Sequence, residues 1–154
     1  MPIHNERGEL VAYDGRWIGS KDTLPAGEGK WKQPPKFQKH CVLYNLHRVA
    51  GRRHLAVVES YWAVFRLHSL GVPAVALMGS ALSAEQVELL EAAGVRFITL
   101  LLDGDTAGRT AAERLVPVLA RAFWVRDVVL PDGAQPDTVD EALLRRIFRL
   151  AAAG

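Results

Sequence analysis

The chain contains little cysteine and no long apolar segment. Cys41 is the single cysteine among its 154 residues, so an internal disulfide and a zinc site built from several cysteines are both excluded. No apolar run is long enough to cross a bilayer, and the first residues lack the pattern of a signal peptide. With 49% hydrophobic and 23% charged residues, these absences predict a cytoplasmic globular protein that does not enter a membrane.

Several motifs of nucleotide-binding and phosphatase proteins are missing as well. Neither Gly-x-x-x-x-Gly-Lys-Ser/Thr nor Gly-x-Gly-x-x-Gly occurs, which argues against a P-loop NTPase and against a dinucleotide-binding fingerprint. Every lysine lies at or before Lys39, whereas haloacid-dehalogenase-type phosphatases and response-regulator receivers both use a lysine late in the chain. The five histidines show no metal-ligand spacing.

Charge is divided unevenly along the chain. Residues 1–54 carry ten Lys or Arg and five Asp or Glu, whereas residues 55–154 carry nine Arg and twelve Asp or Glu. The first part therefore has a net charge of +5 and the second of −3. A basic front and an acidic back predict one part that binds a polyanion and another that binds cations.

From His54 onward, short apolar runs alternate with amphipathic segments. The expected strands are 54–58, 72–78, 95–102 and 125–130, and the expected helices are 60–70, 83–93, 106–122 and 138–151. Trp62 and Phe65 are predicted to lie in the core. This alternation predicts an α/β fold with a doubly wound parallel sheet flanked by helices.

The first part of the chain has a different pattern. Residues 9–16 and 17–18 are expected to form a β-hairpin around Tyr13-Asp14-Gly15, and the polar residues 19–36 are expected to form a loop. We therefore predict two domains, a small basic β-containing lobe over residues 1–53 and an α/β domain over residues 54–154.

Acidic residues follow two of the predicted strands. Glu59 follows the first strand, and Asp103-Gly104-Asp105 follows the apolar run 95–102. The carboxyl ends of parallel strands share one edge of a sheet, where such sheets bind ligands. Paired carboxylates there suit a divalent metal whose shell is completed by water and phosphate. Two other interpretations stay open: a strand-exit turn with a helix cap for the aspartates, and a solvated strand-end acid for Glu59.

Several segments, taken in order, resemble the TOPRIM domain, and more closely the catalytic core of bacterial DNA primases. In the α/β part, the similar segments are Val57–Val64 (VVESYWAV), Ala76–Ser83 (ALMGSALS), Asp103–Ala112 (DGDTAGRTAA) and Leu130–Asp137 (LPDGAQPD). In the front lobe they are Pro2–Gly8, Asp14–Arg16, Phe37–Lys39 and Leu43–Leu46. The resemblance covers nearly the whole chain.

The resemblance implies a DNA-directed RNA polymerase that uses Mg²⁺ or Mn²⁺ to make RNA primers from ribonucleoside triphosphates on a single-stranded DNA template. The implied catalytic residues are Glu59, Asp103 and Asp105, and the implied metal ligands are Glu59, Asp103, Asp105 and Asp137. The residues implied to bind nucleic acid are Arg16, Lys30, Trp31 and Lys39, a mixture of cations and an aromatic that suits a single strand. The residues implied to bind the nucleotide are Gly79, Ser80 and Arg109. A separate zinc-binding module and a replicative helicase are the implied protein partners.

Two departures from the family pattern weaken the expected metal cluster. Ala63 and Gln135 stand where the family has acids. A TOPRIM nuclease and a catalytically weakened, DNA-binding accessory module therefore remain alternatives to the primase core. Asp137 also has a second interpretation, as the N-cap of the last helix.

Overall fold

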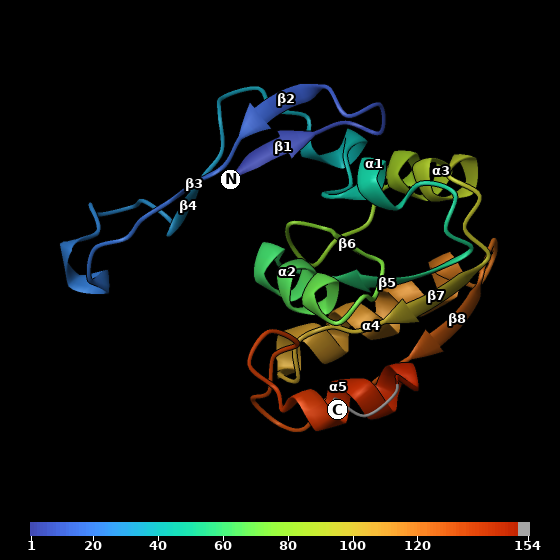
Figure 1. The fold of residues 1–154 in the computed structure, drawn as a ribbon. Helices are drawn as coiled ribbons and strands as arrows, with labels where there is room; N and C mark the ends of the chain where they lie inside the picture. Colours follow the sequence, from blue (N-terminus) through green and yellow to red (C-terminus); the bar gives the residue numbers. More distant parts are fainter. Residues whose placement is uncertain (151–154) are drawn as a thin grey trace.

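The computed structural model describes residues 1–150, in which a parallel sheet lies between two layers of helices and a small β lobe precedes it (Figure 1). The strands are β1 (Pro2–His4), β2 (Leu10–Tyr13), β3 (Gly15–Arg16), β4 (Trp31–Lys32), β5 (His54–Val58), β6 (Ala74–Ala76), β7 (Phe97–Leu100) and β8 (Trp124–Asp127). The helices are α1 (Leu46–Val49), α2 (Tyr61–Ser69), α3 (Ala84–Ala92), α4 (Thr106–Leu119) and α5 (Glu141–Phe148), with short 3-10 helices at Lys21–Thr23 and Lys39–Cys41. Within the described residues, no helix has the length and apolar character needed to cross a membrane.

The main sheet has the strand order β6-β5-β7-β8, and each neighbouring pair is parallel. This confirms the predicted α/β class. β5 has its predicted bounds, whereas β6, β7 and β8 are shorter than the apolar runs that predicted them. Leu101 and Leu102, for example, lie beyond the end of β7 and are still buried, so burial extends past the last paired residue.

Alternate residues of each strand point to opposite faces of the sheet. Leu55 and Val57 pack with residues of α1, α3 and α4, whereas Ala56 and Val58 pack with residues of α2 and α5. Both faces are therefore covered, which explains why the strands have continuous rather than alternating hydrophobicity.

Polar residues mark where the helices of this unit begin. The Ser60 hydroxyl accepts a hydrogen bond from the Ala63 amide at the start of α2, and Ser83 and Gln86 form the predicted capping box of α3. The last helix is shorter than predicted, because Asp140 caps it and α5 begins only at Glu141. Its predicted end at Ala151 lies outside the described residues.

The hairpin predicted around Tyr13-Asp14-Gly15 is wrong. β2 pairs with β1, and β3 pairs with β4, which lies inside the predicted loop. Asp14 is only 3% exposed and its carboxylate accepts a hydrogen bond from the Tyr61 hydroxyl. A residue held in this way cannot form the tip of a solvated turn, so the chain enters a new strand pair instead.

The lobe contacts the sheet unit through α1, which belongs to the main core, through a small apolar cluster and through one β-bridge. Ile3, Ala12 and Val42 are buried together, with Met78 packed against them, and Tyr44 bridges to Ala76 at the end of β6. Residues 15–32, here called the arm, project away from the sheet (Figure 1). β5 begins at His54, and the division into two domains at that point stays a prediction.

Candidate active site

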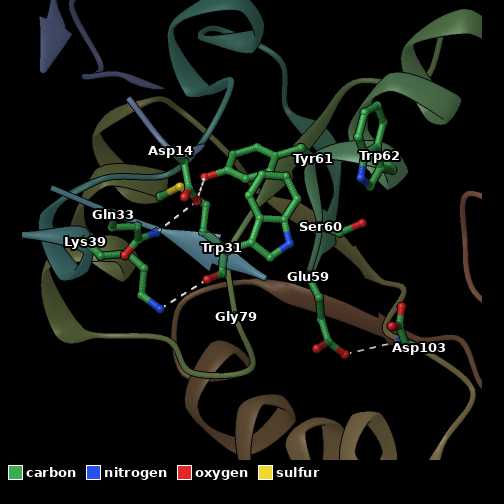
Figure 2. Close-up of a pocket in the computed structure, with 11 residues that line it drawn as sticks. Asp14, Trp31, Gln33, Lys39, Glu59, Ser60, Tyr61, Trp62, Gly79 and Asp103 are labelled. Carbon is green, nitrogen blue, oxygen red and sulfur yellow. Dashed lines mark hydrogen bonds between the residues drawn. The ribbon is translucent and has the colours of Figure 1, made fainter. Parts of the chain in front are cut away.

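Two acidic residues meet where β5 and β7 end. Glu59 directly follows β5, and the backbone N–H of Asp103 donates to Glu59 Oε1 at 3.3 Å (Figure 2). From β5 the chain crosses to β6 on one side and then returns to β7 on the other. The two acids therefore border the point where the strand order reverses, which is where open α/β sheets bind ligands.

Asp105 lies beside this pair and caps the following helix. Its Oδ1 accepts a hydrogen bond from the Gly108 amide at 2.7 Å, at the first turn of α4. The helix-cap interpretation is thus correct for one oxygen of Asp105. The cap also fixes the direction of the side chain, which keeps its charge close to Asp103.

Two glycines allow the chain to fold tightly around the aspartates. A Cβ atom at Gly104 would lie 2.1 Å from the carbonyl oxygen of Pro131, and one at Gly108 would lie 2.1 Å from that of Asp103. The Gly104 amide donates to the Ala134 carbonyl at 2.7 Å. Only glycine permits these approaches, which bring the loop after β8 to the acids.

Burial and neighbouring acids raise the pKa values of Glu59 and Asp103. Burial is the main cause that raises the pKa of Glu59, and the charges of Asp103 and Asp105 add to it. Burial also raises the pKa of Asp103, with further contributions from Asp105 and Asp137. Carboxylates that repel one another in a partly buried site are a favourable environment for a cation.

The donor set fits a hard divalent ion that keeps part of its hydration shell. Glu59, Asp103 and Asp105 each use one oxygen to accept a hydrogen bond from an N–H group, which leaves a second carboxylate oxygen on each. Within residues 1–150, no three acidic, histidine or cysteine side chains are already arranged around one point as a metal cluster. These residues therefore fit a hard divalent cation held by one or two carboxylates, with water and phosphate completing its shell.

Of the two departures from the family pattern, Gln135 contacts the acids, whereas Ala63 is buried in the core. Gln135 donates from its amide nitrogen to Asp103 Oδ2 at 3.1 Å, so a neutral group occupies an oxygen of the central acid. Ala63 is 1% exposed and packs within the core on the α2 side of the sheet. Asp137 lies near Asp103 and does not cap the last helix, because Asp140 does.

A cavity of about 460 Å³ opens between the acids and the N-terminal lobe (Figure 2). Glu59 and Asp103 form one side, and Trp31 and Lys39 come from the lobe. The Lys39 ammonium donates to the Met78 carbonyl at 3.1 Å and so lies next to Gly79. Lys39, Trp31 and Gly79 are thus brought to the acids, as the resemblance implies.

A second cavity of about 360 Å³ adjoins the first through Asp103. Arg16, Trp62 and Asp137 are among its lining residues. The prediction that Trp62 and Phe65 are core residues is wrong, since each is 39% exposed. Periodicity identified α2 correctly but could not show that its first turn borders a cavity.

The sequence pattern did not identify Asp14 and Tyr61, which connect the lobe to α2 beside the 460 Å³ cavity. Asp14 accepts hydrogen bonds from the Tyr61 hydroxyl at 2.8 Å and from the Gln33 amide at 3.3 Å (Figure 2). Burial, followed by the interaction with Asp14, raises the pKa of Tyr61 well above its ordinary value, so the phenol stays protonated and donates. Asp14 lies in a segment that was identified, but the sequence pattern indicated a turn.

Three of the implied binding residues line neither of these two cavities. Lys30 is exposed on the arm, and its carbonyl accepts from the Trp17 amide. Ser80 is half-buried beyond Gly79. Arg109 forms an ion pair with Asp132 at 2.9 Å, on the α4 side of the acids. Their roles in binding nucleic acid or nucleotide stay predictions.

Comparison with known proteins identifies relatives of this arrangement. The family described as Toprim-like matches residues 56–140, more than half of the chain. The chain is 35% identical over 144 residues to the DNA primase of Myxococcus xanthus, a match that covers 90% of this chain and 23% of that protein. The chain therefore spans about a quarter of the length of the curated relatives it matches.

Solved structures agree with the sequence relatives. The zinc-binding and RNA polymerase domains of the Aquifex aeolicus primase superpose with a TM-score of 0.80 at 30% identity, over 97% of this chain and 38% of that one. A DnaG primase catalytic domain bound to single-stranded DNA superposes with a TM-score of 0.76 at 29% identity, over 96% of this chain and 48% of that one. The similarity extends through the lobe as well as the sheet.

Proposed function

Because this chain belongs to the Toprim-like family and is similar to bacterial DNA primases over nearly its whole length, we propose that it is a primase-type catalytic module. It would join ribonucleotides into RNA primers on a single-stranded DNA template. The reaction is nucleotidyl transfer, in which a hydroxyl attacks the α-phosphorus of a nucleoside triphosphate and pyrophosphate leaves.

One observation carries the proposal. Glu59 and Asp103 meet at the ends of adjacent strands and face a cavity whose other side is formed by cationic and aromatic side chains of the lobe. Acids on one side suit a cation and the phosphates it binds, and Lys39 and Trp31 on the other suit a nucleic acid strand. A small-molecule hydrolase would not need the basic lobe.

In this proposal, cations of the lobe bind phosphates and an acid of the sheet edge accepts a proton. Lys39 and Arg16 would bind phosphates electrostatically, and Lys39 would do so beside Gly79, where the backbone has no side chain to obstruct a phosphate. Glu59 would accept the proton of the attacking hydroxyl at Oε2, since Oε1 is held by the Asp103 amide. A raised pKa brings this carboxylate closer to the range in which a general base works well.

Mg²⁺ or Mn²⁺ is proposed as the cofactor, with Asp103 and Asp105 as its main ligands and Glu59 or Asp137 beside them. When bound, such an ion would neutralise the triphosphate and lower the pKa of the attacking hydroxyl. We further propose that the module works in the cytoplasm with a zinc-binding module and a replicative helicase, as the resemblance implies.

The surroundings of Asp103 favour a second candidate function, that of a DNA-binding accessory module. The Gln135 amide occupies one of its oxygens, and Ala63 supplies no carboxylate. A module with so few acids could hold single-stranded DNA for another protein without catalysing transfer. A TOPRIM nuclease uses the same acids, but the lobe with Arg16 and Lys39 favours template binding over cleavage.

The deciding experiment incubates the protein with end-labelled single-stranded DNA, labelled ribonucleotides and Mg²⁺ or Mn²⁺, beside the variant Asp103→Ala/Asp105→Ala. New labelled RNA that the variant does not make would support a primase module. Shortened DNA that the variant does not produce would indicate a nuclease. DNA binding with neither product would indicate the accessory module.

A further inference from the structure

Trp62 places an exposed indole next to the acids. It occupies the first turn of α2, three residues after Glu59, and is 39% exposed while its neighbours Tyr61 and Ala63 are buried. Its ring contacts Phe65 edge-on, with centroids 5.7 Å apart. Part of the ring is therefore open to solvent beside charged residues, which leaves a π-surface that a ligand can contact.

The indole lies where the two cavities meet. It lines the 460 Å³ cavity with Glu59 and the 360 Å³ cavity with Asp137, and Asp103 borders both. Either volume falls within the range of small-molecule sites. A ligand whose phosphate lies at Asp103 would therefore have Trp62 within reach of its next chemical group.

A cation accompanies the ring. The Arg16 guanidinium lies 5.4 Å from the centroid of Trp62 and 5.5 Å from that of Trp31, so cation–π contacts hold it near both indoles. Among the described residues, no carboxylate lies within ion-pair distance of Arg16, even though it shares a cavity with Asp137. Its charge is available to an anion that enters from solvent.

We propose that Trp62 is a base-stacking residue of the active site, and that Arg16 binds the phosphate next to the stacked base. A flat π-surface, an unpaired cation and a nearby acidic site match the base, phosphate and metal-bound phosphate of a nucleotide in a strand or a triphosphate. The inference deepens the proposed function and rests on it. It adds a residue that the sequence pattern assigned to the core.

The test compares Trp62→Leu, which keeps apolar volume but loses the π-face, with Trp62→Phe, which keeps a smaller π-face. The control is Trp124→Leu, because Trp124 is 77% exposed on β8 and lines a different cavity. Affinity is measured for fluorescent oligodeoxythymidylate and separately for ATP with Mg²⁺, and each variant's Tm is recorded.

We expect Trp62→Leu to weaken binding of one probe roughly five- to hundredfold, while Trp62→Phe and Trp124→Leu stay within about twofold of the parent. The salt dependence of Trp62→Leu should be unchanged, since no charge is lost. Loss for the oligonucleotide alone identifies the template base as the partner, and loss for ATP alone identifies the incoming base. Unchanged affinity for both probes, or equal losses in the Leu and Phe variants, would overturn the proposal.

A second measurement covers the case in which Trp62→Leu does not fold. The unaltered protein is titrated with an oligonucleotide that carries abasic sites, and equal affinity for the abasic and intact strands would overturn base stacking. The result is separable from the proposed function. Weaker binding by Trp62→Leu in a protein that makes no RNA would support the stacking residue alone, whereas RNA synthesis with normal binding by that variant would remove the stacking residue alone.

Discussion

The acidic edge of the sheet and the arm differ in how firmly packing holds them in place. Glu59 and Asp103 are positioned by β5 and β7, whose residues are buried on both faces. The arm is exposed along residues 15–20. Its contacts with the sheet unit are those of Trp31 with Tyr61 and of Arg16 with Trp62, and Asp14, just before it, accepts a hydrogen bond from the Tyr61 hydroxyl. The geometry of the acids thus depends on the sheet, whereas the position of the arm depends on a small number of contacts that a single substitution can remove.

The largest expected effect is on the sheet side. Gly104→Ala places a methyl group 2.1 Å from the Pro131 carbonyl, so the loop after β8 must move away from the acids. We expect a loss of about 3 kcal/mol in the free energy of unfolding, at the upper end for overpacked sites. Urea denaturation measures this loss, and Gly29→Ala in the arm controls for the loss of a glycine, because a Cβ atom there meets only ordinary contacts and the backbone φ is not positive. Unchanged stability would mean that the loop after β8 can move without cost, so that the edge of the sheet is not rigid.

The next effect tests the attachment of the arm. Tyr61→Phe removes the hydroxyl that donates to Asp14, whose Oδ1 is already buried without a partner among the described residues. Such a loss typically costs about 1–3 kcal/mol. Limited proteolysis should then cut the arm faster, while hydrogen exchange of β5 and β7 stays slow.

The matched control for this variant is Tyr13→Phe, because Tyr13 is 60% exposed. If both variants resist protease equally, Asp14 and Tyr61 do not hold the arm in place.

These two regions also differ in how far the sequence predicted them. The sheet was predicted correctly because burial on both faces leaves continuous apolar runs, and Glu59 and Asp103 were found because such strands end at one edge. Asp14 and Trp62 were misassigned, because their surroundings depend on partners distant in sequence. Tyr61, which fixes Asp14, lies 47 residues away. Local turn chemistry and helical periodicity carry no information about such contacts.

The next prediction is a smaller effect on stability, and it is a gain where the previous variants lose stability. Asp103→Asn should raise the Tm of the metal-free protein by a few degrees at neutral pH. The pKa of Asp103 is raised by burial and by its acidic neighbours, so its stabilising protonated form is lost as the pH rises through the folded-state pKa. Asparagine removes that cost, and the gain should shrink as the pH falls toward the ordinary carboxyl range.

Scanning fluorimetry with a chelator measures the gain, and the control is Asp132→Asn, because Asp132 is an exposed acid in the loop after β8. Adding Mg²⁺ should then stabilise the parent protein but not Asp103→Asn, because the ion binds only where the charge remains. Equal stabilisation of both proteins would place the cation elsewhere.

The smallest effect concerns the arm's charge alone. Lys30 is exposed, so Lys30→Ala should leave Tm unchanged and weaken single-strand binding modestly. Each lost phosphate contact reduces the slope of log affinity against log salt by about 0.7. Lys30→Ala with Lys39→Ala should therefore reduce the slope by about 1.4, whereas Arg121→Ala, beyond the far end of α4, should not change it. If Lys39→Ala alone produced the whole change, the strand would bind at the cavity without contacting Lys30, and the outer part of the arm would play no part in binding.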